Sequence, residues 1–353
     1  MTSTMNRLLK IIFGLAIIAI IVLAVSVRSY LASPVAGLTE PMLYKVEAGA
    51  SLSGVAHDLE GQGILSRAGL FVAWGRFTGQ AAQLKAGEYE LQPGVTPKGI
   101  LDQFVAGQVK LYPFTILEGW TITELLAALA VNPAITASLQ ALSAEAQIDV
   151  LGLSAEHLEG QFFPDTYLVP RATTDLNLLQ QAAALMQVQL DKAWENRAVG
   201  LPLTSPYELL ILASIVERET ALDEERSQVA GVFIRRLQKR MRLQTDPTVI
   251  YGLGAAYDGN ITRKHLLTDT PYNTYTRGGL PPTPIGMPGE ASLLAAAHPD
   301  EGDALYFVAT GENDGSHVFS RTLEEHNAAV AVYIARLRKA RREAEKSGAG
   351  KNK

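Results

Sequence analysis

The chain has 353 residues, of which 47% are hydrophobic and 19% are charged, so it has the composition of an ordinary globular protein and enough length for two domains. Its formal net charge of −5 argues against a nucleic-acid-binding protein, which needs a basic face. The sequence contains no cysteine, and this excludes disulfides, thiolate metal ligands and a cysteine nucleophile.

The N-terminal segment predicts a membrane-spanning helix. Residues 11–27 carry no charge, and Arg7 and Lys10 precede them. As a helix, residues 8–27 would span about 30 Å, the thickness of a bilayer's hydrocarbon core. A cleaved signal peptide is the alternative, but the apolar run exceeds the usual ~7–15 residues and Arg28 follows it at once.

The positive-inside rule sets the expected orientation of this span. We expect residues 1–7 in the cytoplasm, a single pass over 8–28 in the cell (inner) membrane, and the rest of the chain in the periplasm or another extracytoplasmic space. A linker of small residues and proline at 29–42 then separates the membrane from the first folded region.

Residues 43–116 predict a small α+β module, because short strands alternate with short amphipathic helices. Strands are expected at 43–46, 85–91 and 108–116, and helices at 51–60, 68–77 and 97–106.

Residues 117–342 predict a larger, mostly helical region with a few strands, so the fold class is α+β. Asn132 is the expected N-cap of its second helix, with proline at the first helical position. The basic tail at 343–353 is expected to be flexible. Helices are expected at 121–130, 133–140, 175–196, 206–220 and 322–342, with a loop-rich stretch after Leu243 and a strand at 304–309.

The helix expected at 206–220 carries the leading catalytic candidate, Glu217. Its body is apolar on nearly all sides, which predicts that the helix is buried. At 100° per residue, Glu217 faces the small side chains of Ala213 and Ser214, whereas Glu219 points about 200° away from it. Burial disfavours an ionised carboxylate, which suits Glu217 to the role of a general acid.

A structural role is the alternative for Glu217. Buried acids are often neutralised by a neighbouring arginine, and Arg218, Arg235 and Arg236 are close in the sequence. On the helix pattern alone, both interpretations stay open.

Several sequence blocks in this region resemble the endolytic murein transglycosylase family (MltG/YceG-like), and the likeness extends from the N-terminal anchor to the closing helix. One position departs from the family pattern, because Met287 stands where asparagine is usual. The blocks are 213–220 (ASIVERET), 229–233 (VAGVF), 236–237 (RL), 243–252 (LQTDPTVIYG), 271–275 (PYNTY), 279–285 (GLPPTPI), 317–320 (HVFS) and 325–327 (EHN).

This resemblance implies a lyase that cleaves the β-1,4 bond between N-acetylmuramic acid and N-acetylglucosamine inside peptidoglycan strands. The products carry 1,6-anhydro ends, no cofactor is used, and the enzyme is expected to terminate nascent strands beside peptidoglycan synthases. The family's catalytic glutamate matches Glu217, and residues 43–116 resemble its LysM-like module, which is associated with glycan binding.

The remaining site candidates are polar and aromatic residues of the loop-rich stretch, which could bind sugar or could be loop scaffolding. Glu159 and Asp165, in an aromatic loop, are favoured as structural residues. His317 and His326 lack the spacing of metal ligands, so no metal is expected. The substrate-binding candidates are Gln244, Asp246, Tyr251, Tyr272, Asn273 and Tyr275.

Two other functions fit the same sequence. A muramidase that uses water would need a second carboxylate, for which Asp246 is the candidate. A scaffold without catalytic activity would organise wall synthesis by binding glycan through residues 43–116. A lytic transglycosylase needs only one carboxylate, because the nucleophile is the C6 hydroxyl of the substrate itself.

Overall fold

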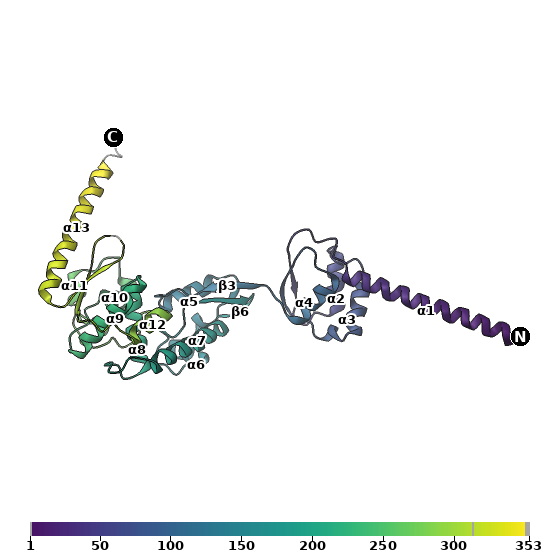
Figure 1. Ribbon diagram of the computed structural model, residues 1–353, viewed down its shortest axis with the longest axis horizontal. Coiled ribbons are helices and arrows are strands. Elements are labelled where there is room, and N and C mark those ends of the chain that lie inside the picture. The colour runs from purple at the N-terminus through teal and green to yellow at the C-terminus, as the bar shows by residue number, and fades with distance from the viewer. Residues whose placement is uncertain (1, 313, 350–353) are drawn as a thin grey trace. The chain divides into compact units, whose positions relative to one another are not determined.

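The computed structural model describes residues 2–312 and 314–349, and its chain divides into two compact units (Figure 1). The first unit runs to Tyr112 and includes Leu168–Ala172. The second comprises Pro113–Tyr167 and the chain from Thr173 onward. The described structure is a mixed α+β fold that is mostly helical, with few strands.

The first unit packs three short helices and an antiparallel pair of strands around one core. Strand β1 (Met42–Val46) pairs antiparallel with β2 (Gly87–Leu91). Tyr89 and Phe104 are fully buried at its centre. Ser51 and Thr96 cap the first and last of the three helices through their hydroxyls. The helices are α2 (Leu52–Gly61), α3 (Ala68–Phe77) and α4 (Pro97–Ala106), with a 3₁₀ turn η1 (Gln80–Ala82) between the last two.

Helix α1 (Thr2–Ala32) begins the chain and continues without a break into this unit. Residues Met5–Ala32 are apolar and long enough to cross a membrane, and the apolar part is exposed. The helix does not end at Arg28, where the linker 29–42 was expected to begin, because Leu31 is buried in the core of the unit. The first four residues of the expected linker are therefore helical.

The second unit is built around α8 (Pro206–Glu219), whose residues Leu209–Val216 are all buried. Four helices contact α8: α7, α9, α10 and α12. The Ser205 hydroxyl caps its first turn by accepting the backbone N–H of Glu208. The helices of this unit are α5 (Ile122–Val131), α6 (Ala144–Leu151), α7 (Asp175–Glu195), α8, α9 (Asp223–Gln238), α10 (Asp246–Leu253), α11 (Arg263–Leu267), α12 (Glu290–Ala297) and α13 (Leu323–Ala349), with 3₁₀ turns η2 (Leu139–Ala141) and η3 (Gly254–Ala256).

The strands after the first unit form two-stranded sheets only. Strand β3 (Leu111–Thr115) pairs with β5 (Thr166–Pro170), and the division between the units passes through both strands. Strand β4 (Ile135–Thr136) pairs in parallel with β6 (Thr173–Thr174). Strand β7 (Tyr306–Ala309) pairs antiparallel with β8 (His317–Ser320), and α13 contacts both.

Two sequence predictions about this unit are wrong. The helix expected at 133–140 does not form, because Asp175 accepts the backbone N–H groups of Ser138 and Leu139 and holds the segment in a strand and a 3₁₀ turn. The tail expected to be flexible from residue 343 is instead a continuation of α13 to Ala349, and residues 350–353 lie outside the described part of the chain.

Candidate active site

The last turn of α8 places its two glutamates in different surroundings. Glu219 lines a pocket of about 610 Å³ in the second unit. Glu217, two residues earlier on the helix, is not among the residues that line this pocket. Helical spacing accounts for the separation, because residues two apart point about 200° away from each other.

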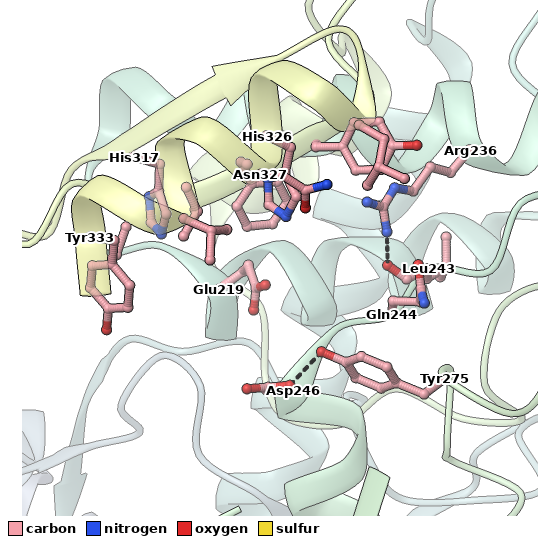
Figure 2. A pocket seen from close by; sticks show the side chains of 16 residues that line it. Glu219, Arg236, Leu243, Gln244, Asp246, Tyr275, His317, His326, Asn327 and Tyr333 are labelled. Atoms are coloured by element: carbon pink, nitrogen blue, oxygen red, sulfur yellow. Dashed lines mark hydrogen bonds between the residues drawn. The ribbon is translucent and has the colours of Figure 1, made fainter. Parts of the chain in front are cut away.

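The pocket brings together residues from seven segments of the second unit (Figure 2). In Figure 2, Glu219 lies between Asp246 on one side and His326 and Asn327 of α13 on the other. The lining residues are Glu219, Arg236, Leu243, Gln244, Asp246, Tyr275, Tyr306–Ala309, His317, Leu323, His326, Asn327, Val330 and Tyr333.

Glu219 is held at the pocket by a side-chain hydrogen bond from Thr245 and is buried there. The hydroxyl of Thr245 donates to its Oε2 at 3.2 Å. Burial raises the pKa of Glu219 to about 8, and the negative charge of Asp246 acts in the same direction. The Thr245 hydrogen bond and the positive charge of Arg236 oppose that rise. Glu219 is therefore protonated at neutral pH, as a general acid must be.

The loop before α10 places two of the predicted sugar-binding residues in this pocket. Gln244 has φ of +50°, a left-handed conformation that is uncommon for a residue with a side chain. Its backbone N–H donates to the carbonyl of Thr274 at 3.2 Å. The Tyr275 hydroxyl donates to Asp246 at 2.6 Å, and burial raises the pKa of Tyr275, so this phenol stays neutral.

The opposite wall is aromatic and cationic. The Tyr306 ring stacks on His326 with ring centroids 5.2 Å apart, and the guanidinium of Arg236 lies 5.2 Å from the Tyr306 centroid. Nδ1 of His326 is buried without a hydrogen-bond partner in the described part of the protein. Burial, followed by the charge of Arg236, lowers the pKa of His326, which keeps the imidazole neutral.

Glu217 has the contacts of a structural carboxylate. Its side chain is only 5% exposed, its Oε2 accepts the backbone N–H of Gly289 at 2.9 Å, and its Oε1 lies 3.5 Å from the guanidinium of Arg226. Arg226 also pairs with Asp223. Glu217 thus binds the residue that begins α12, and its charge is balanced by an arginine that the sequence did not single out.

The three arginines named as partners for Glu217 have other contacts. Arg218 donates to the carbonyl of Gly119, Arg235 to the carbonyls of Asp300 and Ala304, and Arg236 to those of Leu243 and Leu305. Sequence spacing could not identify Arg226, because it belongs to α9 and reaches Glu217 only through the packing of α8 against that helix.

Three of the predicted sugar-binding residues lie outside the set that lines the Glu219 pocket. Tyr251 donates through its hydroxyl to Glu159 at 2.9 Å, and Tyr272 shares a hydrogen bond with Thr283. Asn273 is 1% exposed and donates to three backbone carbonyls of the 265–268 turn. These contacts are those of loop scaffolding.

The two acids of the aromatic loop also have structural contacts. Glu159 is 3% exposed and accepts from the backbone N–H of Ile122 as well as from Tyr251. Burial raises the pKa of Glu159 to about 7. Asp165 accepts the backbone N–H of Thr166 at 2.6 Å.

Met287, which stands where the family usually has asparagine, occupies a buried site. Its side chain is fully buried, and its backbone N–H and C=O bond to Trp120 and Gly119. The backbone of this loop therefore makes the polar contacts, and an apolar side chain fills the core beneath it. Elsewhere, His317 is bound to Glu225 at 2.7 Å, and within residues 2–312 and 314–349 no group of three or more His, Asp or Glu could hold a metal ion.

Comparisons with known proteins agree with the sequence resemblance. A model of the YceG-like family matches residues 44–332. The endolytic murein transglycosylase of Bacillus subtilis is 32% identical over 312 residues, which cover 82% of this chain and 84% of that protein. The endolytic murein transglycosylase of Streptococcus pneumoniae is 27% identical over 321 residues, which cover 81% of this chain but only 57% of that longer protein.

A solved structure extends the likeness to the fold. The crystal structure of a YceG-like protein from Listeria monocytogenes is 31% identical and superposes with a TM-score of 0.51, covering 82% of this chain and 99% of its own. Because the family model spans most of the sequence, and a relative above 30% identity is covered over 84% of its length, the chain belongs to the YceG-like family.

Proposed function

We propose that this protein is an endolytic lytic transglycosylase of peptidoglycan in which Glu219, the acid that lines the pocket, transfers the protons. Glu217, which matches the family's catalytic glutamate, stays the alternative catalytic residue. Family membership and the 32% identity to an endolytic murein transglycosylase support the activity. The choice of Glu219 over Glu217 rests on the residues that line the pocket. The pocket contains Glu219 together with Gln244, Asp246 and Tyr275, whereas Glu217 is paired with Arg226 and Gly289.

The chemistry follows from a carboxyl group that is protonated at neutral pH. Glu219 donates its proton to the glycosidic oxygen as the bond from that oxygen to C1 of the muramoyl residue breaks. The resulting carboxylate then takes the proton of the C6 hydroxyl as its oxygen bonds to C1, which gives the 1,6-anhydro product. The nucleophile is tethered to the reacting ring, so no activated water is required.

The rest of the pocket stabilises the charge that develops on the sugar ring. The Asp246 carboxylate supplies negative charge, the amide of Gln244 can donate to substrate oxygens, and the Tyr275 oxygen, whose hydrogen is donated to Asp246, can accept from a substrate hydroxyl. Stacking of Tyr306 between Arg236 and His326 fixes the opposite wall.

The presence of Asp246 in the same pocket as Glu219 also favours a second candidate, a muramidase that uses water. Mass spectrometry of digested glycan strands separates the two reactions: anhydro ends mark a lytic transglycosylase, and reducing ends mark a hydrolase. The absence of any cleavage would indicate the glycan-binding scaffold.

The direct test of the assignment compares Glu219→Gln with Glu217→Gln. Glutamine cannot donate the catalytic proton, so the Glu219 variant should lose about 10²–10⁴-fold in anhydromuropeptide release. Glu217→Gln keeps a side-chain oxygen that can accept from Gly289, so it should retain most activity per folded molecule. Release by a folded Glu219→Gln protein, together with loss in folded Glu217→Gln, would restore Glu217 as the catalytic residue.

Thermal melts of the same proteins check the burial argument. The pKa of Glu219 is about 8 in the folded protein and 4.5 in the unfolded chain. Its contribution to the free energy of unfolding is therefore fully present below pH 4.5 and is lost as the pH rises through 8. Glu219→Gln cannot ionise, so it should gain stability over the wild type between pH 4 and pH 8. If the difference in melting temperature between Glu219→Gln and the wild type were the same at pH 4 and at pH 8, Glu219 would not be desolvated.

The rest of the chain supports a membrane-anchored arrangement. We propose that α1 is a single-pass anchor with its N-terminus in the cytoplasm, because Arg7 and Lys10 precede its uncharged run. We further propose that residues 43–116 form a LysM-like module that binds glycan, and that the enzyme acts beside peptidoglycan synthases.

A further inference from the structure

The first unit has an apolar groove between α1 and α3. Its volume is about 870 Å³, and it is lined by Ile20 and Leu23 on one side and by Leu70, Trp74 and Phe77 on the other. Phe77 is 85% exposed, and Ile20 and Leu23 are more than half exposed. Large aromatic side chains are rarely left this open in water without a partner.

The position of α1 relative to this groove is fixed within the unit. The helix runs without a break to Ala32, Leu31 is buried, and Tyr30 packs against the core cluster formed with α2, α3 and α4. Helix α1 also contacts α4 directly. The apolar surface of α1 is therefore continuous with the apolar surface of α3 across the groove.

The charges on α1 show where the bilayer meets the unit. Lys10 and Arg28 enclose the uncharged run, and the 18 helical steps between them rise about 27 Å, close to the hydrocarbon thickness. Ile20 and Leu23 lie before Arg28, on the hydrocarbon side of it. Phe77 and Trp74 line the same groove, which follows α1 from Ile20 past Arg28 to Ala32, so they lie beside the end of the span that enters the unit.

We propose that the first unit is partly immersed in the bilayer that α1 crosses, with Leu70, Trp74 and Phe77 of α3 among the acyl chains and Arg28 and Lys98 at anionic lipid phosphates. Arg28 and Lys98 both line the groove, and Lys98 is exposed. Aromatic residues next to cations are typical of the boundary between hydrocarbon and headgroups. This inference rests on the proposal that α1 is a membrane anchor.

Immersion of α3 would restrict the height and orientation of the first unit at the membrane. A single helix alone would leave the unit free to tilt above the membrane, whereas a second contact through α3 fixes its height and orientation. Glycan bound by this unit would then be held close to the membrane surface.

Spin labelling tests the immersion, and the chain contains no native cysteine that would interfere. Single variants F77C, I12C and L43C of the full-length protein carry a nitroxide in nanodiscs of phosphatidylethanolamine and phosphatidylglycerol. Accessibility is measured to oxygen, which concentrates in hydrocarbon, and to a water-soluble nickel chelate. Ile12 lies inside the proposed span, and Leu43 is an exposed leucine of the same unit that does not line the groove.

We expect the label at F77C to favour oxygen, as at I12C, and the label at L43C to favour nickel. Nickel access at F77C with oxygen access at I12C overturns the immersion and leaves the anchor intact. Nickel access at I12C overturns both. Spin–spin broadening at F77C overturns the proposal in favour of contact with a second copy.

Tryptophan fluorescence gives a second measurement that does not need a substitution at Phe77. The chain has three tryptophans, and only Trp74 lines the groove. Lipids with brominated acyl chains should quench the wild-type emission, and W74F should lose most of that quenching. Equal quenching in wild type and W74F would contradict the immersion.

Discussion

At the scale of single residues, the ionisation of Glu219 should be visible in the pH dependence of turnover. The group acts first as an acid, so activity should fall as pH rises through its pKa of about 8. Asp246 contributes to that raised value by its charge. Asp246→Asn should therefore lower the pKa of Glu219 and move the basic limb of the pH profile to lower pH. Turnover at pH 6 should be reduced by the lost negative charge but remain measurable.

The same variant separates two mechanisms. If Asp246 were the second carboxylate of a muramidase, Asp246→Asn would abolish turnover at every pH rather than shift the limb. The measurement is the initial rate of glycan cleavage between pH 5 and pH 9. Asp246→Asn also disturbs the hydrogen bond from Tyr275. Tyr275→Phe is the control, because it removes that hydrogen bond and leaves the charge of Asp246 in place.

Gln244 offers a test of a strained residue at a functional site. A left-handed conformation costs a residue with a side chain about 1 kcal/mol or more, and glycine relieves it. Gln244→Gly should keep the stability of the protein or raise it slightly, because the backbone is relieved while its N–H still binds Thr274. Turnover should fall, because the side-chain amide leaves the pocket.

Arg240 gives the matched control for this experiment. It has φ of +55°, almost the same as Gln244, but it does not line the pocket. Arg240→Gly should therefore change the melting temperature in the same direction and leave turnover unchanged. A fall in activity in both variants would indicate a backbone effect rather than loss of the Gln244 amide.

At the scale of elements, the contact between α8 and α12 depends on Glu217. Glu217→Ala removes the acceptor of the Gly289 N–H and leaves the buried Arg226 with only Asp223, an exposed partner, as its ion pair. The free energy of unfolding should fall by about 2–3 kcal/mol. Asp223→Ala, which removes the exposed acid, should cost less than about 1 kcal/mol.

Denaturant titration of both variants checks this prediction. The reverse order, with Asp223→Ala the more damaging, would contradict the structural role of the Glu217 carboxylate. Substitution of Gly289 is also restricted, because a side chain at this position would meet the Glu118 carboxylate. The start of α12 thus tolerates little change.

Elements with local signals could be predicted from the sequence. Helices α3 and α4 have the predicted bounds, and α8 starts at the predicted residue, because these helices depend on signals in their own sequence: the apolar face of α3, and the capping hydroxyls of Thr96 and Ser205 for α4 and α8. The segment 133–140 could not be predicted, because Asp175, from the start of α7, determines its conformation. A side chain about 40 residues away is invisible to a local pattern.

The same distinction applies to the candidate site. Helical spacing places Glu217 and Glu219 on different faces of α8. It does not predict which of these faces lies next to α13 and the loop before α10. Gln244, Asp246 and Tyr275, which the sequence groups as sugar-binding candidates, line one pocket together with Glu219, and Glu217 is not among the residues that line it. His326 was weighed only as a metal ligand, although its buried, unpaired nitrogen lies at the pocket.

At the scale of the whole molecule, the first unit can be removed only at a position that the strand pairing allows. Strand β3 pairs with β5, so a chain that begins at Leu117 lacks β3 and leaves β5 with an exposed edge. A chain that begins at Gln108 keeps both strands. We expect the longer chain to be folded and the shorter one to melt at lower temperature or to aggregate.

The chain that begins at Gln108 then tests what the first unit contributes to catalysis. All the residues that line the Glu219 pocket belong to the second unit, so the proton transfers should survive the truncation. We expect kcat on soluble glycan strands close to that of the full-length enzyme and a higher KM, because the proposed glycan-binding module is absent. Complete loss of turnover in a truncated protein with a cooperative thermal melt would show that the first unit helps to form the active site.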